Sequence, residues 1–183
     1  TRRKSATRAL LQDIAGRLKA AGMRVDLLDL AIESLPMFNP DSCHTAPYYP
    51  PLKARVESAD VLLIGTPDYH GTMSSAAKNF LDHFWKEYSG KLFAMVVASP
   101  DKGLTVVDHL RTVARQCYAW ALPYAVTFVE EADMKDGQIA SDALRERVEM
   151  LVRDVRVYGE LLARQRSADL AGNDPGFMAR LRR

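Results

Sequence analysis

Three short polar segments carry the side chains best suited to hold a ligand, and the first of them opens the sequence. Residues 1–7 place Arg2, Ser5 and Thr7 directly before an apolar helical pattern. Backbone N–H groups and the positive end of the helix dipole attract phosphate at such a position, and an arginine adds a charge-assisted hydrogen-bonding fork. The segment therefore predicts a phosphate site. The alternative is a plain helix start in which Ser5 or Thr7 serves only as the N-cap.

The second polar segment, residues 66–73, directly follows a short apolar run. It contains Pro67, Asp68, Tyr69, His70 and Gly71. Proline and glycine define the path of the backbone, Tyr69 offers a flat apolar face, and exposed amides can hydrogen-bond to a planar heterocycle. In the alternative interpretation the segment is a structured loop in which His70 is merely polar.

The third polar segment is weaker. It consists of Ser99, Pro100, Asp101, Lys102 and Gly103. Gly103 allows the backbone to approach a ligand closely, but the segment alone is more typical of a plain turn.

Alternating helical and strand-like patterns surround these segments. We expect helices over residues 6–21, 52–58, 74–88, 104–120 and 140–166, and strands over 24–30, 60–65, 91–98 and 123–129. This alternation predicts an α/β fold, a three-layer sandwich in which a parallel sheet carries helices on both faces. In such sheets ligands bind beyond the carboxyl ends of the strands, where the three polar segments would meet.

The order of the expected helices and strands predicts one strand in addition to the four that the hydrophobic pattern shows. The pattern opens with a helix, whereas this class of sheet usually opens with a strand. We therefore expect a first strand before Thr1 that is missing here. We expect residues 1–166 to form one domain and residues 167–183, with Gly172, Pro175 and Gly176, to form a C-terminal tail.

The composition of the chain limits the classes of protein to which it can belong. The chain has 183 residues, a net charge of +2 and 48% hydrophobic residues, as expected of one globular domain rather than of a nucleic-acid-binding protein. No apolar run is long enough for a membrane span, and no signal peptide is recognisable. The cysteines, Cys43 and Cys117, suit a reduced compartment, so we expect a cytoplasmic protein without a membrane partner.

Several common site motifs do not occur in the sequence. There is no Gly-x-Gly-x-x-Gly dinucleotide fingerprint, no Walker A motif and no Gly-x-Ser-x-Gly elbow. The four histidines show no metal-binding spacing with cysteine, so we expect no metal. Cys117 lies on the apolar stripe of the helix expected over 104–120, which favours a place in the core over a role as a nucleophile.

Taken together, the polar segments resemble the NADPH-dependent FMN reductase family, a flavodoxin-like group. Arg2, Ser5 and Thr7 match the later positions of the family pattern Gly-Ser-x-Arg-x-x-Ser-x-Asn, with threonine in place of asparagine. Residues 67–72 match Pro-Glu-Tyr-Asn-Gly-Ser, and Lys78, Asn79 and Asp82 match the Lys-Asn-x-x-Asp that follows it. Asp68 stands for the family's glutamate and His70 for its asparagine.

The resemblance implies an oxidoreductase in which the cofactor carries the chemistry and no protein side chain is catalytic. Arg2, Ser5 and Thr7 would hold the FMN phosphate, and Pro67, Asp68, Tyr69, His70 and Gly71 would line the isoalloxazine ring. Ser99, Lys102 and Gly103 would flank the other side of the ring. Hydride would pass from NADPH or NADH to FMN, and electrons would leave to a flavin, a quinone or a similar small molecule.

Two other functions stay open at the level of the sequence. One is a flavodoxin-type electron carrier or FMN-binding module without its own NADPH activity. The other is a scaffold that has lost its cofactor and binds a protein partner through residues 167–183. The resemblance also implies a homodimer or homotetramer, for which Phe84, Trp85 and Tyr88 are candidate interface aromatics.

Overall fold

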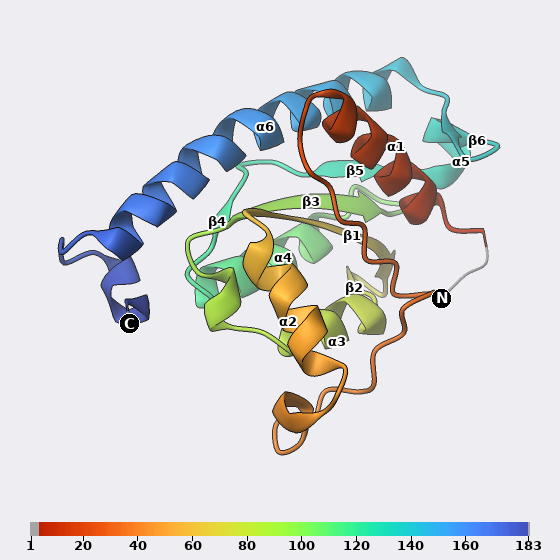
Figure 1. Cartoon of the computed structure of the whole chain (residues 1–183). Coiled ribbons are helices and arrows are strands. Elements are labelled where there is room, and N and C mark those ends of the chain that lie inside the picture. Colours follow the sequence, from red (N-terminus) through yellow and green to blue (C-terminus); the bar gives the residue numbers. More distant parts are fainter. Residues whose placement is uncertain (1–3, 183) are drawn as a thin grey trace.

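A twisted, mostly parallel sheet forms the middle layer of the computed structural model, which describes residues 4–182 (Figure 1). β1 (Val61–Tyr69) pairs in parallel with β3 (Leu92–Ala98), from Val61 opposite Leu92 to Pro67 opposite Ala98. On the other edge of β3 lie β4 (Trp120–Ala121) and β5 (Val126–Phe128), both parallel to β3. The short β2 (Thr72–Met73) turns back along the end of β1 as an antiparallel hairpin.

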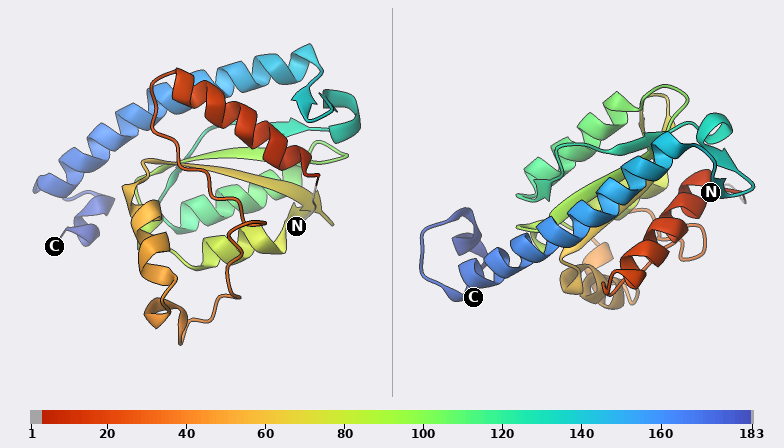
Figure 2. Two further views of the ribbon diagram at one scale, coloured as in Figure 1. Left: turned by 45° about the vertical axis from the view of Figure 1, so that its right-hand side comes forward. Right: turned by 90° about the horizontal axis from the view of Figure 1, so that it is seen from above.

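Helices cover both faces of the sheet, which confirms the predicted three-layer architecture (Figure 2). One face carries α1 (Ala6–Ala20) and α6 (Asp142–Ala171). The other carries α2 (Tyr49–Ser58), α3 (Ser75–Asp82) and α4 (Leu104–Gln116). Shorter elements complete the chain: η1 (Cys43–Thr45), η2 (Lys86–Tyr88), α5 (Glu130–Asp133), β6 (Met134–Lys135), β7 (Gln138–Ile139) and η3 (Phe177–Leu181).

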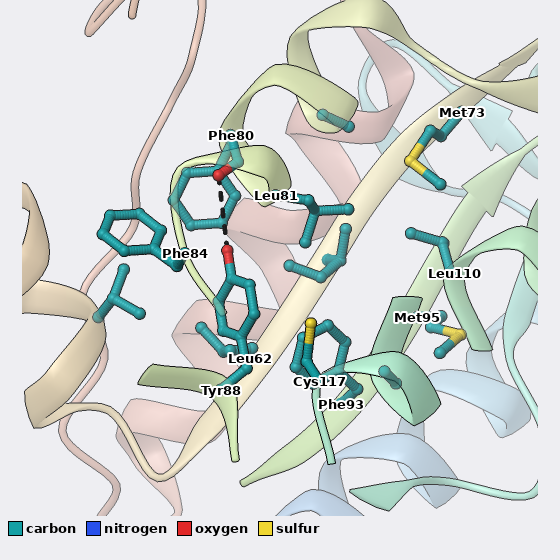
Figure 3. Packing of buried hydrophobic residues seen from close by; sticks show 14 of the residues in the cluster. Leu62, Met73, Phe80, Leu81, Phe84, Tyr88, Phe93, Met95, Leu110 and Cys117 are labelled. Carbon is teal, nitrogen blue, oxygen red and sulfur yellow. Dashed lines mark hydrogen bonds between the residues drawn. The ribbon is translucent and has the colours of Figure 1, made fainter. Parts of the chain in front are cut away.

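The core beneath α3 and α4 is rich in aromatic rings (Figure 3). Tyr88 and Phe93 are both fully buried, with ring centroids 5.3 Å apart, and Phe84 packs edge-on against Tyr88. The Tyr88 hydroxyl donates to the Phe80 carbonyl at 3.5 Å. Phe84 and Tyr88 therefore belong to the core and not to an interface, and of the three aromatics named from the sequence only Trp85 is exposed.

Two expected helices end early. The helix expected over 74–88 ends at Asp82 because the His83 ring turns back and donates from Nδ1 to the Asn79 carbonyl at 2.7 Å, while its Nε2 lies 3.0 Å from the Tyr48 hydroxyl. The helix expected over 104–120 ends at Gln116 because Tyr118 adopts a left-handed backbone (φ 57°) and the chain enters β4. Of the strand expected over 123–129 only β5 (Val126–Phe128) forms, and it is separated from β4 by a stretch that contains Pro123, which has no N–H to donate to the sheet.

Two other helices are longer than expected. α2 begins at Tyr49 rather than residue 52, because Pro50 and Pro51 fit the first turn, where backbone N–H groups need no partner within the helix. α6 runs five residues past 166 to Ala171, so the expected domain boundary falls inside a helix. After α6 the chain folds back and buries Met178 against Gly90, while Arg166 donates to the Ser89 carbonyl at 3.0 Å.

The strand expected over 24–30 does not form. This segment is extended, but within the described residues it pairs with no strand, and in Figure 1 it passes β1 without joining the sheet. Side chains hold it instead. Asp29 is paired with Arg8 of α1 at 2.5 Å, and Asp26 is paired with Arg55 of α2 at 2.7 Å. The expectation of a strand is wrong for the described structure, because none of its strands is hydrogen-bonded to this segment.

Lys91 provides a pH-dependent test of the packing. It is 1% exposed, and its Nζ donates to the carbonyls of Val56 (2.5 Å) and Glu57 (2.9 Å) at the end of α2. Burial, and then the nearby Arg166, lower the pKa of Lys91 to about 8. A lysine in the unfolded chain has a pKa of about 10.4, so the unfolded state binds more protons between these values and stability rises with pH there.

We therefore expect Lys91→Met to remove a pH-dependent part of the stability. Between about pH 8 and about pH 10 the free energy of unfolding of the wild type should rise relative to that of the variant. Urea titrations of both chains at several pH values would measure this difference. If the difference in the free energy of unfolding between wild type and variant stays constant across this pH range, the pKa of Lys91 is not shifted.

Candidate functional site

A cleft of about 520 Å³ opens at the carboxyl edge of β1 and β3, at the start of α1. Its volume lies within the range of small-molecule and cofactor sites. The lining comes from six stretches of chain that are distant in sequence: residues 5–8, 27–31, 67–69, 74–77, 98–100 and 130–131, with Leu11 and Gly65 at the base. All three polar segments singled out in the sequence contribute to it.

The first wall is the N-terminus of α1. Ser5 is the N-cap, and its Oγ accepts from the Arg8 backbone N–H at 3.2 Å. Thr7 lies in the first turn and is 7% exposed. Both residues line the cleft, where the helix dipole and the first backbone amides favour an anion. Arg2 lies outside the described residues.

Arg8 lines the same wall and was not singled out in the sequence. Its Nε donates to Asp29 Oδ2 at 2.5 Å, which joins α1 to the segment over 27–31. Burial acts to raise the pKa of Asp29, but hydrogen bonds from the Ala31 amide and from Arg8 outweigh it and keep the pKa below its usual value. The carboxylate thus stays ionised and fixes Arg8 at the rim of the cleft.

The second wall is the hairpin that joins β1 to β2. Pro67, Asp68 and Tyr69 line the cleft, and Tyr69 keeps 54% of its surface exposed. Most of the segment expected as a loop over 66–73 is strand, because β1 runs to Tyr69 and β2 begins at Thr72. His70 (φ 56°) and Gly71 (φ 76°) are the two left-handed residues of the tight turn between them. These two residues form the tip of the hairpin and do not line the cleft.

A carboxylate joins the hairpin to the third wall, which follows β3. Asp68 Oδ1 accepts from the Gly71 amide at 2.8 Å and closes the turn. Asp68 Oδ2 accepts from Ser99 Oγ at 2.9 Å, and Ser99 Oγ also lies 2.5 Å from the Asp101 carbonyl and 3.2 Å from the Asp101 amide. Ser99 is 4% exposed. Asp68 therefore fixes the spacing between the two loops that flank the cleft.

The remaining residues of the third segment are not among those that line the cleft. Lys102 is exposed, and Gly103 starts α4 with a left-handed backbone (φ 62°). A Cβ atom at Gly103 would lie 2.9 Å from Val97 Cγ1, so this position needs glycine for packing as well as for conformation. Of the third segment, Ser99 and Pro100 line the cleft.

The residues after the matched hairpin have structural partners. Lys78 and Asp82 form an exposed pair one turn apart on α3, with Nζ and Oδ1 separated by 2.5 Å. Asn79 holds the preceding loop, since its Oδ1 accepts from the Phe38 amide at 2.7 Å and its Nδ2 donates to the Pro36 carbonyl at 2.9 Å. Asn79 therefore positions the loop over 36–38, while Lys78 and Asp82 pair with each other on the surface of α3.

Glu130 and Glu131 also line the cleft and were not foreseen. They begin α5 immediately after β5, so the rule that ligands gather at the carboxyl ends of strands would have found them. The same rule, applied to the carboxyl end of the extended stretch over 24–30, would also have found the lining residues over 27–31. Two acidic residues therefore belong to the lining of the cleft.

Comparison with known proteins shows the family of the chain. The model of the NADPH-dependent FMN reductase family matches residues 1–133. An NADPH azoreductase of Bacillus sp. (strain OY1-2) is 32% identical over 137 residues, which cover 73% of this chain and 76% of that protein. An FMN-dependent NADPH-azoreductase of Staphylococcus haemolyticus (strain JCSC1435) is 30% identical over 150 residues, covering 75% of this chain and 78% of that protein.

Solved structures show the same fold. The apo form of an NADH:FMN oxidoreductase superposes with a TM-score of 0.70 at 18% identity, over 86% of this chain and 84% of that one. A flavodoxin from the domain Archaea superposes with a TM-score of 0.60 at 10% identity, over 87% and 94% of the two chains. The fold is flavodoxin-like, as predicted. With the family model matching most of its length, the chain belongs to the NADPH-dependent FMN reductase family.

Proposed function

We propose that this chain is an NADPH-dependent flavin oxidoreductase that holds FMN in the cleft between α1, the β1–β2 hairpin and the loop after β3. The observation that carries the proposal is the helix N-terminus with Ser5 and Thr7 facing the cleft, in a member of the FMN reductase family. FMN supplies the redox chemistry when bound, because it accepts hydride and passes electrons on.

The protein's own task is to bind and orient. The N-terminus of α1 offers backbone amides and hydroxyls to a phosphate, with Ser5, Thr7 and also Arg2 as the proposed phosphate-binding residues. Tyr69 is half-exposed and lines the cleft together with Pro67, Asp68 and Ser99, which we propose to lie beside the isoalloxazine ring. His70 and Gly71 form the hairpin turn, and Lys102 and Gly103 lead into α4; we propose that these four residues lie near the ring without lining the cleft themselves.

The electron acceptor is proposed to be a small aromatic molecule that follows NADPH at the open side of the cleft. The names of the relatives, NADPH azoreductases, point to azo compounds, and quinones have the same flat shape. We also propose a cytoplasmic homo-oligomer. Cys43 and Cys117 are both free and buried, which supports a reducing compartment.

Flavin binding and turnover test the proposal separately. Quenching of FMN fluorescence on addition of the protein measures binding, and NADPH oxidation with an azo dye or a quinone measures activity. Saturable binding together with NADPH oxidation that depends on the acceptor is expected. FMN binding with a flavin that NADPH leaves oxidised would instead identify an electron carrier.

Replacing Asp68 by alanine should loosen the cleft. The Gly71 amide and the Ser99 hydroxyl would both lose an ionised acceptor, and hydrogen bonds to charged groups each contribute about 1.5–3 kcal/mol. We expect the Kd for FMN to rise by about tenfold, as measured by fluorescence titration.

Asp101→Ala is the matched control for Asp68→Ala. It removes the same charge from the same edge of the cleft, while Asp101 enters the hydrogen-bond network through its backbone. An equal change in FMN affinity in both variants would show that only charge matters here. Asp68→Asn, which keeps an acceptor for Gly71, should lie between wild type and Asp68→Ala.

A further inference from the structure

The β1–β2 hairpin depends on contacts outside itself for its position. β2 consists of Thr72 and Met73, and within the described residues β1 is its one strand neighbour. A two-stranded ladder this short is marginally stable in water. The turn at its tip also holds His70 in a left-handed conformation (φ 56°), which is uncommon for a residue other than glycine. Other elements must therefore hold the hairpin in place.

α4 provides two contacts with the hairpin, in addition to those that Asp68 makes. A Cβ atom at Gly71 would lie 3.4 Å from Thr105 Oγ1, so the turn lies directly against the start of α4. Thr72 Oγ1 lies 3.0 Å from His109 Nδ1, within hydrogen-bonding distance. Thr105 and His109 are four residues apart and therefore lie on the same face of the helix. Two successive hairpin residues thus meet two successive turns of α4.

The core fixes the part of α4 that carries His109. Val106 and Leu110 are fully buried and belong to the core cluster beneath α3 and α4. Side chains in a close-packed core keep defined positions, so the backbone at residue 109 is a rigid support. The His109 side chain itself is exposed. Its removal is therefore expected to affect the hairpin that it contacts more than the stability of the fold.

The register of the hairpin connects this contact to the cleft. Thr72 lies directly opposite Tyr69 in the antiparallel pair, and Met73 lies opposite Asp68. Asp68 and the half-exposed Tyr69 both line the cleft. The Cα atoms of opposite residues in such a pair are about 4.5–5.5 Å apart, so a displacement of Thr72 moves Tyr69 with it.

We propose that His109 is a positioning residue for the flavin: it holds Thr72, and through Thr72 it sets the place of Tyr69 beside the isoalloxazine ring. This rests on the proposed function, which places FMN in the cleft. His109 does not itself line the cleft and is not catalytic. The shared proton belongs to Nδ1 or to the Thr72 hydroxyl according to the tautomer of the imidazole, and both arrangements join the same two residues.

A double-mutant cycle on the pair tests the proposal. Thr72→Val removes the hydroxyl with little change of shape, His109→Ala removes the imidazole, and a third chain carries both substitutions. Thr72→Ser keeps the hydroxyl, and His109→Asn keeps a polar group one bond from Cγ, where Nδ1 stands. Thr112→Val is the matched control, since Thr112 is an exposed threonine of α4 three residues beyond His109.

Each variant is compared with the wild type in three ways. Fluorescence titration gives the Kd for FMN. The visible circular dichroism of the bound flavin reports on the groups around the ring, and a loss of stability alone would not change it. Hydrogen exchange of the Gly71 amide is measured without FMN. This amide donates to Asp68 Oδ1, so its exchange reports on opening of the hairpin.

We expect Thr72→Val and His109→Ala each to raise the Kd for FMN by about fivefold, to change the circular dichroism of the bound flavin and to speed exchange at Gly71. The double variant should match either single variant, because both substitutions remove one shared interaction. Thr72→Ser and His109→Asn should return all three quantities toward the wild-type values, and Thr112→Val should leave them unchanged.

Effects that add in the double variant would mean that His109 and Thr72 act separately, and would overturn the proposal. Faster exchange at Gly71 with unchanged affinity and circular dichroism would also overturn it, since His109 would then hold the hairpin without positioning the flavin. A wild-type chain that binds no FMN would instead contradict the proposed function, and exchange at Gly71 would still show whether His109 anchors the hairpin.

Discussion

Ser5→Asp is expected to weaken FMN binding by at least about hundredfold without destabilising the fold. Ser5 caps α1 and lines the cleft where the phosphate is proposed to bind. Like charges about 4 Å apart repel by about 4 kcal/mol at an effective dielectric constant of about 20, and each 1.4 kcal/mol is about a tenfold change in affinity. Aspartate is as good an N-cap as serine, and its charge favours the helix N-terminus.

Ser5→Asn separates charge from shape in this experiment. It keeps the capping acceptor and adds no charge, so FMN affinity should remain within a few-fold of wild type. Fluorescence titration gives the affinities, and urea unfolding without FMN gives the stabilities. If Ser5→Asp binds FMN as tightly as Ser5→Asn, the phosphate does not lie at the start of α1 and the proposed orientation of the cofactor is wrong.

Met178→Ala is expected to lower the free energy of unfolding by roughly 2–4 kcal/mol. Met178 is 1% exposed although it lies in the final short helix of the described chain. A Cβ atom at Gly90 would lie 2.9 Å from its sulfur, so the side chain packs directly on the turn that leads into β3. The expectation follows from the cavity that alanine would leave beneath η3.

Arg180→Ala is the control for Met178→Ala, since Arg180 is exposed on the same short helix. It should change stability by less than about 0.5 kcal/mol. Both substitutions lie near the amino end of β3, whereas the cleft lies at its carboxyl end, so FMN affinity should stay the same. Equal urea midpoints for the two variants would mean that the packing of Met178 does not contribute to the stability of the fold.

Periodicity predicted most of the layers because burial enforces it. Leu10, Ile14 and Leu18 recur at helical spacing and are all buried, and the continuous apolar run of β3 is buried between the two helical layers. The ends of the helices were harder to predict from the sequence. α3 and α4 stop where His83 binds a carbonyl and Tyr118 turns left-handed, and both events depend on tertiary packing that local patterns do not encode.

The segment over 24–30 shows a different limit. Its residue types suit a strand, but a strand requires a neighbouring backbone, and none is paired with it in the described structure. Arg8 and Arg55 hold it through Asp29 and Asp26 instead. Pairing partners that are distant in sequence cannot be read from the segment itself.

The cleft was partly foreseen. Ser5, Thr7, Pro67, Asp68, Tyr69 and Ser99 all line it, because strand ends and a helix start meet at one edge of the sheet. Arg8 was missed since it reads as an ordinary helix surface residue, and Glu130 and Glu131 were missed since they follow an interrupted strand. The hairpin turn at His70 and Gly71 was read as part of the lining, although it closes the tip.

The most direct test of the central claim is the visible absorption spectrum of the FMN-loaded chain, recorded without oxygen before and after addition of NADPH. The account predicts a bound-flavin spectrum that bleaches with NADPH and returns when an azo dye or a quinone is added. Ser5→Asp should show the spectrum of free flavin under the same conditions. A protein that leaves FMN free in solution, or a bound flavin that NADPH does not reduce, would contradict the account.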